Sequence, residues 1–126
     1  MTIAFANSYA RLPERFFVRQ RPDVPPAPEM LRFNRALAER LGLDARALDG
    51  PAGARLLSGA ELPEGAEPLA MAYAGHQFGN WVPQLGDGRA ILLGEVVAPD
   101  GTRFDIHLKG AGRTPFSRGG DGKAVL

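Results

Sequence analysis

The chain has 126 residues, 44% of them hydrophobic, which fits one globular domain and excludes a disordered polyelectrolyte. Its 15 Lys and Arg nearly balance 14 Asp and Glu, so a net charge of +1 gives no reason to expect a nucleic acid or an anionic membrane as a partner. The absence of cysteine excludes disulfides and thiolate metal sites. No secretory signal and no membrane-spanning apolar run is visible, so we expect a cytoplasmic protein.

Residues 1–28 are expected to form an extended arm, because the prolines of 22–28 restrict their own φ angles and the residues before them. Aromatic residues at positions 5, 9, 16 and 17 are expected to hold this arm on a larger body, since a free tail has little use for them. The first segment is therefore predicted to be irregular but packed.

Short helices are expected to follow the arm. Apolar residues at helical spacing predict a helix over 29–41 that ends at Gly42. A short helix is expected at 44–48, capped by its first residue. The capping-box spacing that begins at Ser58 predicts about one further turn, and small residues predict a last helix over 67–74.

The pattern then changes to that of a β-sheet. Residues 90–97 read as a strand that is apolar on both faces, and 103–109 alternate strictly between apolar and polar or charged residues. Residues 98–101 join them as a turn, in which Pro99 sets φ and Gly101 accepts a positive φ. Because both faces of the first strand need cover, we expect the isolated 126 residues to fold poorly.

Two glycines stand directly before the first strand of this hairpin. Gly86 and Gly88 let the backbone turn tightly and bring N–H groups close to phosphate oxygens, and Arg89 adds a charge with bidentate reach. The alternative is a plain hairpin turn that needs glycine for φ > 0. Both interpretations stay open on this motif alone.

Lys109 ends the second strand and lies 21 residues after Gly88. A glycine-rich turn, a strand, a tight turn and a second strand that ends in lysine is the order found in protein-kinase N-lobes. There the loop covers the phosphates and the lysine contacts them. The tight turn returns the lysine to the glycine loop, although a solvated lysine at a strand end remains an alternative.

Together these elements predict an α+β fold. Residues 1–66 are expected to form the arm and a helical segment, and residues 67–126 the incomplete start of a kinase-like nucleotide-binding lobe with an antiparallel sheet. The apolar run that begins at Ala124 has no cap, breaker or polar tail. We therefore expect the natural sequence to continue.

Residues 110–123 predict a glycine-rich loop that carries Arg113, Arg118 and Lys123. Over 103–126 the sequence has five Lys and Arg against two Asp, a local excess of +3. These cations suit phosphates, but a solvated loop or an RNA-binding Arg-Gly-Gly segment stays open. Asp121, between two glycines, suits either a ligand hydroxyl or an Asx turn.

Other catalytic signals are weak. The two histidines have no metal-binding partner at the usual spacing, and no catalytic triad, paired-carboxylate or Walker A motif appears. We therefore assign no catalytic and no metal-binding residue. Tyr73, Phe78 and Trp81 suit stacking on a base, but packing in the core is the favoured interpretation.

Long motifs in a fixed order occupy the second half of the chain. They are Tyr73–Gly79, Pro83–Ala90, Leu93–Glu95, Leu108–Gly112, Thr114–Arg118 and Gly120–Leu126. With the opening residues 7–17, they resemble the selenoprotein O family of kinase-like protein adenylyltransferases. The resemblance covers essentially the whole chain and is far more specific than one glycine loop.

This resemblance implies a protein-kinase-like fold that transfers AMP, not phosphate, from ATP to Ser, Thr or Tyr hydroxyls of proteins. It implies ATP with Mg²⁺ or Mn²⁺ as cofactors and proteins as substrates. The general-base Asp and the metal-binding Asn and Asp of the family are expected beyond residue 126, so these residues alone are expected to be inactive. Carried over position by position, the nucleotide contacts are Gly86, Gly88, Arg89, Lys109, Asp121 and Gly122.

Two other classes of function remain as alternatives. One is a non-catalytic nucleotide-binding or regulatory module, which predicts ATP affinity that depends on Lys109 and Arg89 without turnover. The other is a small RNA-binding or structural domain that uses the basic loop, which predicts steep salt dependence and indifference to ATP.

Overall fold

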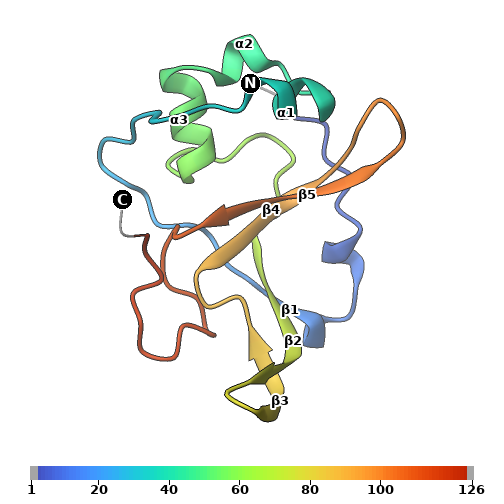
Figure 1. The fold of residues 1–126 in the computed structure, drawn as a ribbon, viewed down its shortest axis with the longest axis vertical. Helices are drawn as coiled ribbons and strands as arrows, with labels where there is room; N and C mark the ends of the chain where they lie inside the picture. The colour runs from blue at the N-terminus through green and yellow to red at the C-terminus, as the bar shows by residue number, and fades with distance from the viewer. Residues whose placement is uncertain (1–2, 125–126) are drawn as a thin grey trace.

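The computed structural model describes residues 3–124, which form an α+β fold as expected (Figure 1). Five strands make one antiparallel sheet in the order β1-β2-β4-β5, and β3 pairs with β2 off this path. Three short helices lie together on one side of the β4–β5 pair, and β3 lies on the other side (Figure 1). The elements are η1 Tyr9–Arg11, η2 Glu14–Phe16, β1 Phe17–Arg19, α1 Arg35–Arg40, α2 Ala45–Leu48, α3 Pro51–Ser58, β2 Leu69–Gln77, β3 Asn80–Gly86, β4 Ala90–Val97 and β5 Arg103–Lys109.

The β4–β5 hairpin has the bounds predicted from the sequence. Its ladder runs from Ala90 opposite Lys109 to Val97 opposite Arg103, and Gly101 adopts a φ of 85° in the turn. Residues 91–96 are all buried by other parts of this chain. Both faces of β4 are therefore covered, which removes the reason for expecting the chain to fold poorly.

The helix predicted over 67–74 is wrong, because residues 69–74 belong to β2 and residues 67–68 are not helical. The first half of β2 pairs with β1 and β4, and its second half pairs with β3. Leu69 and Ala70 are fully buried at the point where these pairings meet. Strand pairing and burial therefore override the helical preference of the small residues.

The helix predicted over 29–41 is shorter than expected and is limited to α1. Asn34 is its N-cap, because its side chain accepts a hydrogen bond from Leu37 N at 3.0 Å. An N-cap residue has non-helical φ and ψ, so the helix begins directly after Asn34. Residues 29–34 are therefore not helical. Gly42 follows with a φ of 76°, which confirms the predicted end.

The next two helices differ in how well the sequence indicated them. The helix predicted at 44–48 is confirmed as α2, with the Asp44 side chain accepting from Ala47 N at 3.1 Å. The turn predicted after Ser58 is wrong, because Ser58 ends a helix instead of starting one. That helix, α3, was not predicted, although Pro51 in its first turn and Gly59 after its end are the usual signals.

The N-terminal arm packs on the sheet, as predicted. Phe5 forms an antiparallel bridge with Val96, and Ala6 N donates to the Glu95 carbonyl at 2.7 Å. Apolar residues from both halves of the chain share one core cluster, formed by Ala10, Phe17, Leu69 and Leu92 with Tyr9 and Met71 packed against it.

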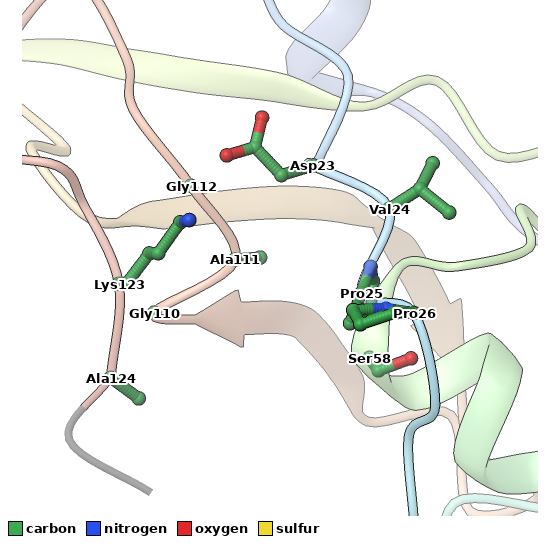
Figure 2. Close-up of a pocket in the computed structure, with 10 residues that line it drawn as sticks. All are labelled: Asp23, Val24, Pro25, Pro26, Ser58, Gly110, Ala111, Gly112, Lys123 and Ala124. Atoms are coloured by element: carbon green, nitrogen blue, oxygen red, sulfur yellow. The ribbon is translucent and has the colours of Figure 1, made fainter.

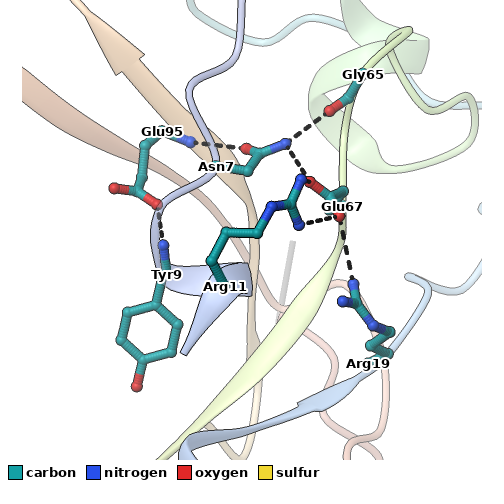
Figure 3. A network of polar contacts seen from close by, with 7 residues as sticks. All are labelled: Asn7, Tyr9, Arg11, Arg19, Gly65, Glu67 and Glu95. Atoms are coloured by element: carbon teal, nitrogen blue, oxygen red, sulfur yellow. Dashed lines mark hydrogen bonds and ion pairs between the residues drawn. The ribbon is translucent and has the colours of Figure 1, made fainter. Parts of the chain in front are cut away.

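Two carboxylates hold the arm in place (Figure 3). Glu95, on the buried strand β4, accepts from the Ser8 hydroxyl and from Tyr9 N at 2.7 Å. Glu67 accepts two hydrogen bonds from Arg11, at 2.8 and 2.9 Å, and one from the Asn7 amide at 3.0 Å. The arm therefore forms specific polar contacts with the body in addition to apolar ones.

The Glu95 carboxylate is buried yet charged. Burial by itself raises the pKa of Glu95, but the hydrogen bonds from Ser8 and Tyr9 and the nearby Arg103 outweigh it and lower the pKa below the usual 4.5. A carboxyl group with a lowered folded-state pKa stabilises the fold above its unfolded pKa. This contribution is lost as the pH falls through the lowered value.

We predict that Glu95→Gln lowers the free energy of unfolding at neutral pH by about 1–3 kcal/mol, because the partners of this buried carboxylate lose their charged acceptor. The difference in the free energy of unfolding between the wild type and the variant should shrink as the pH falls below 4.5, the ordinary pKa of glutamate. Denaturant unfolding at several pH values measures both effects.

Glu61→Gln is the matched control, because the Glu61 side chain is 58% exposed in its pair with Arg55. It should cost less than about 0.5 kcal/mol. The prediction is contradicted if the difference in the free energy of unfolding between wild type and Glu95→Gln stays constant into strongly acidic solution.

Candidate functional site

A pocket of about 440 Å³ opens between two loops. One is the glycine loop, residues 86–89, directly before β4, and the other is the basic loop, residues 110–123, after β5. The pocket contains Gly86, Gly88, Arg89, Asp121 and Gly122, which are five of the six nucleotide contacts expected from the sequence. The other residues that line it are Gln77, Leu85, Phe116, Ser117, Arg118, Gly120 and Lys123.

Lys109, the sixth expected contact, lies beside this pocket. Its Cα is opposite Ala90 in the ladder, and the next residue, Gly110, donates its N–H to the Arg89 carbonyl at 2.7 Å. The hairpin thus returns the lysine to the glycine loop, as the spacing predicted. Lys109 itself, however, lines a neighbouring cavity of about 470 Å³ and not the pocket.

Close packing explains why positions 86 and 88 are glycine. Neither has a φ between +20° and +160°, so the alternative of a turn that needs glycine for a left-handed φ is wrong. A Cβ on Gly86 would lie 2.5 Å from the Phe116 ring and 2.6 Å from the Met71 carbonyl oxygen. A Cβ on Gly88 would lie 2.9 Å from the Phe116 carbonyl oxygen, so the basic loop can approach only because both side chains are absent.

The basic loop is closed on itself at its ends. Ala111 forms a bridge with Lys123, and Gly112 N donates to the Gly122 carbonyl at 3.1 Å. Gly122 has a φ of 70° and lies against the backbone of Gly112, so no side chain fits there. Asp121 accepts from Lys123 N at 2.9 Å, which is the Asx turn that the sequence left open.

The pocket carries excess positive charge. Arg89, Arg118 and Lys123 line it against one carboxylate, Asp121. All three cations are exposed, and none forms an ion pair within residues 3–124. Arg113 instead donates to the Gly120 carbonyl at 2.9 Å and stabilises the loop. Unpaired cations beside a glycine loop are suited to an anion with several oxygens.

A second cavity, of about 280 Å³, lies between the basic loop and the proline-rich part of the arm (Figure 2). Here the proline-rich part of the arm runs along the loop, and Asp23 N donates to the Ala111 carbonyl at 2.8 Å. Gly112 is needed at this contact, because a Cβ would lie 2.5 Å from the Asp23 carboxyl carbon. Lys123 lines both cavities, so the arm contacts the same loop that brings this cation to the pocket.

Three aromatic residues of the β2–β3 segment are not in the core, which corrects the sequence prediction. Tyr73 is 48%, Phe78 93% and Trp81 68% exposed. They lie on or next to β2 and β3, which pair beyond the part of the sheet that the arm and helices cover. Their hydrophobicity predicted burial, but only the strand pairing determines that they face outward.

Residues 3–124 contain no group of three or more His, Asp or Glu that could hold a metal ion. In the same part of the chain, no helix has the length and apolarity required to cross a membrane.

The sheet and pocket by themselves define a class of protein. An antiparallel sheet with a few short helices, in which a glycine loop precedes one strand and a lysine ends the next, is consistent with an α+β kinase-like N-lobe.

Comparison with known proteins identifies the family. The sequence model of Protein adenylyltransferase SelO matches residues 1–126, so the chain belongs to this family. It is 68% identical over 122 residues to a protein nucleotidyltransferase YdiU of Alkalilimnicola ehrlichii, which covers 97% of this chain and 25% of that protein. It is 61% identical over 126 residues to a protein of the same name from Sphingopyxis alaskensis, covering 100% of this chain and 26% of that protein. The chain thus spans about a quarter of the length of these relatives.

We predict that Gly86→Ala destabilises the fold by about 1–3 kcal/mol, because the new Cβ meets backbone and a packed ring that cannot both move away. Gly50→Ala is the matched control, because Gly50 has an extended φ of 166° and a Cβ added there would have no atom within 4 Å. Thermal unfolding of the two variants compares them. Equal unfolding temperatures would show that the close approach of Phe116 does not constrain position 86.

Proposed function

We propose that the full-length protein transfers AMP from ATP to Ser, Thr or Tyr hydroxyls of proteins, and that the pocket between the glycine loop and the basic loop holds the nucleotide. The observation that carries this proposal is the convergence of Gly86, Gly88, Arg89, Asp121 and Gly122 on one pocket with unpaired cations. Membership of the SelO family and the printed names of the relatives, protein nucleotidyltransferase, support it.

The glycine loop suits a phosphate group because of how its backbone is paired. The carbonyl oxygens of Asp87 and Gly88 accept hydrogen bonds from the Thr114 and Ser117 hydroxyls. The N–H of Gly88 has no partner within residues 3–124. The loop therefore has donor capacity left for an anion while its acceptors are occupied.

Arg89 and Lys109 are proposed to contact the phosphates from the two ends of the hairpin. Both are exposed and free of ion pairs within residues 3–124. Lys109 has a long flexible side chain, so its ammonium group can turn from the neighbouring cavity toward the phosphates. These cations lower the energy of charge that develops on the phosphate during transfer.

The divalent metal, Mg²⁺ or Mn²⁺, is proposed to be held by residues outside 3–124, since the described residues offer no suitable cluster. A bound metal would neutralise phosphate charge. Asp121 and Gly122 are proposed as further contacts of the nucleotide. We further propose a cytoplasmic location, proteins as the second substrate, and no nucleic-acid partner.

We predict that the full-length protein, given Mg²⁺ or Mn²⁺, attaches label to protein from ATP labelled at the α-phosphate but not at the γ-phosphate. Arg89→Ala and Lys109→Ala should each weaken ATP binding by about tenfold to a hundredfold, the usual cost of removing a charged hydrogen-bond partner. Arg46→Ala is the matched control, an exposed arginine on α2 outside the pocket.

The other outcomes separate the alternatives. Label from the γ-phosphate would indicate an ordinary kinase. ATP binding that depends on Arg89 and Lys109 without any label would indicate a non-catalytic nucleotide-binding module. Binding of RNA with steep salt dependence and indifference to ATP would overturn the proposal in favour of an RNA-binding domain.

A further inference from the structure

The glycine loop is tied to the basic loop by two hydroxyl groups. The Thr114 hydroxyl donates to the Asp87 carbonyl at 2.5 Å and accepts from Phe116 N at 3.1 Å. The Ser117 hydroxyl donates to the Gly88 carbonyl at 2.5 Å and accepts from Thr114 N at 2.8 Å. Thr114 is only 4% exposed, so one polar side chain of this pair is buried between the loops.

The opposite side of the glycine loop is tied to β2. Asp87 N donates to the Met71 carbonyl at 2.9 Å, and Met71 N donates back to the Asp87 carboxylate at 3.1 Å. The Tyr73 hydroxyl donates to the other carboxylate oxygen at 3.2 Å. The loop is thus held from two directions, by β2 through Asp87 and by the 114–117 turn through Thr114 and Ser117.

We infer that Thr114 and Ser117 are positioning residues that lock the glycine loop against the basic loop and so keep the nucleotide pocket preformed. This inference rests on the proposed function, because it concerns how the same pocket binds ATP. Neither hydroxyl needs to touch the nucleotide. Each acts through the backbone of Asp87 or Gly88, on which the position of the loop depends.

Preorganisation explains why such a lock improves binding. A loop of glycines has many backbone conformations, and ordering it at the moment of binding would weaken the affinity. The hydroxyl bonds and the packing of Phe116 on Gly86 order it beforehand. Removing one hydroxyl leaves a carbonyl without its partner, which frees the loop and costs about tenfold in affinity.

The test compares Thr114→Val, which keeps the shape and removes the hydroxyl, with Thr114→Ser, which restores the hydroxyl. Ser117→Ala removes the second bond. Ser8→Ala is the structural control, because it removes a hydroxyl hydrogen bond to the Glu95 carboxylate, away from the pocket. In the full-length protein, calorimetry gives the ATP dissociation constant, and amide hydrogen exchange reports loop opening.

We expect Thr114→Val and Ser117→Ala to bind ATP about tenfold more weakly and to exchange faster at residues 86–89, with the β4–β5 hairpin unchanged. Thr114→Ser should restore binding, and Ser8→Ala should lower stability without changing ATP affinity. If wild-type protein binds ATP and both hydroxyl-free variants bind it equally well, the inference is overturned. If Ser8→Ala weakens binding as much as they do, a general loss of stability is the cause and the inference is also overturned. A wild-type protein that does not bind ATP refutes the proposed function instead.

Discussion

Burial of β4 on both faces is the constraint on which the rest of the structure depends. Residues 91–96 are all buried although β4 belongs to a single sheet, so other parts of the chain must cover it. The arm does so from one direction, and it lies so close to Gly94 that a Cβ there would be 2.5 Å from the Phe5 ring. The buried Glu95 then binds the backbone and hydroxyl of the arm, which sets where the arm lies.

The pocket depends on the same strand. Arg89 immediately precedes β4, and Lys109 pairs with its first residue, so one end of the β4–β5 hairpin brings the glycine loop and the basic loop together. The loops then lie in contact because Gly86 and Gly88 have no side chains. A cationic pocket follows, since Arg89, Arg118 and Lys123 converge there with only Asp121 to oppose them.

Local signals in the sequence predicted some elements well. The β4–β5 hairpin was correct because strict alternation and a Pro-Asp-Gly turn are strong and short-ranged. The cap at Asp44 was correct for the same reason. The helix over 67–74 was wrong, because β2 owes its conformation to pairing with strands that lie far from it in the sequence. No window of a few residues contains that information.

The sequence by itself determined the family: two glycines, an arginine and a strand-end lysine stand in an order that resembles the selenoprotein O family, and the family match covers the chain. Only the tertiary structure decided why those positions are glycine. The reason is the approach of Phe116, not a positive φ. Only the tertiary structure showed that Thr114 and Ser117 tie the loops together. Each hydroxyl binds a carbonyl that lies 27 or 29 positions earlier in the sequence, and the two meet only after the hairpin has formed. Composition and spacing specify chemical groups, whereas their distances depend on how distant segments pack.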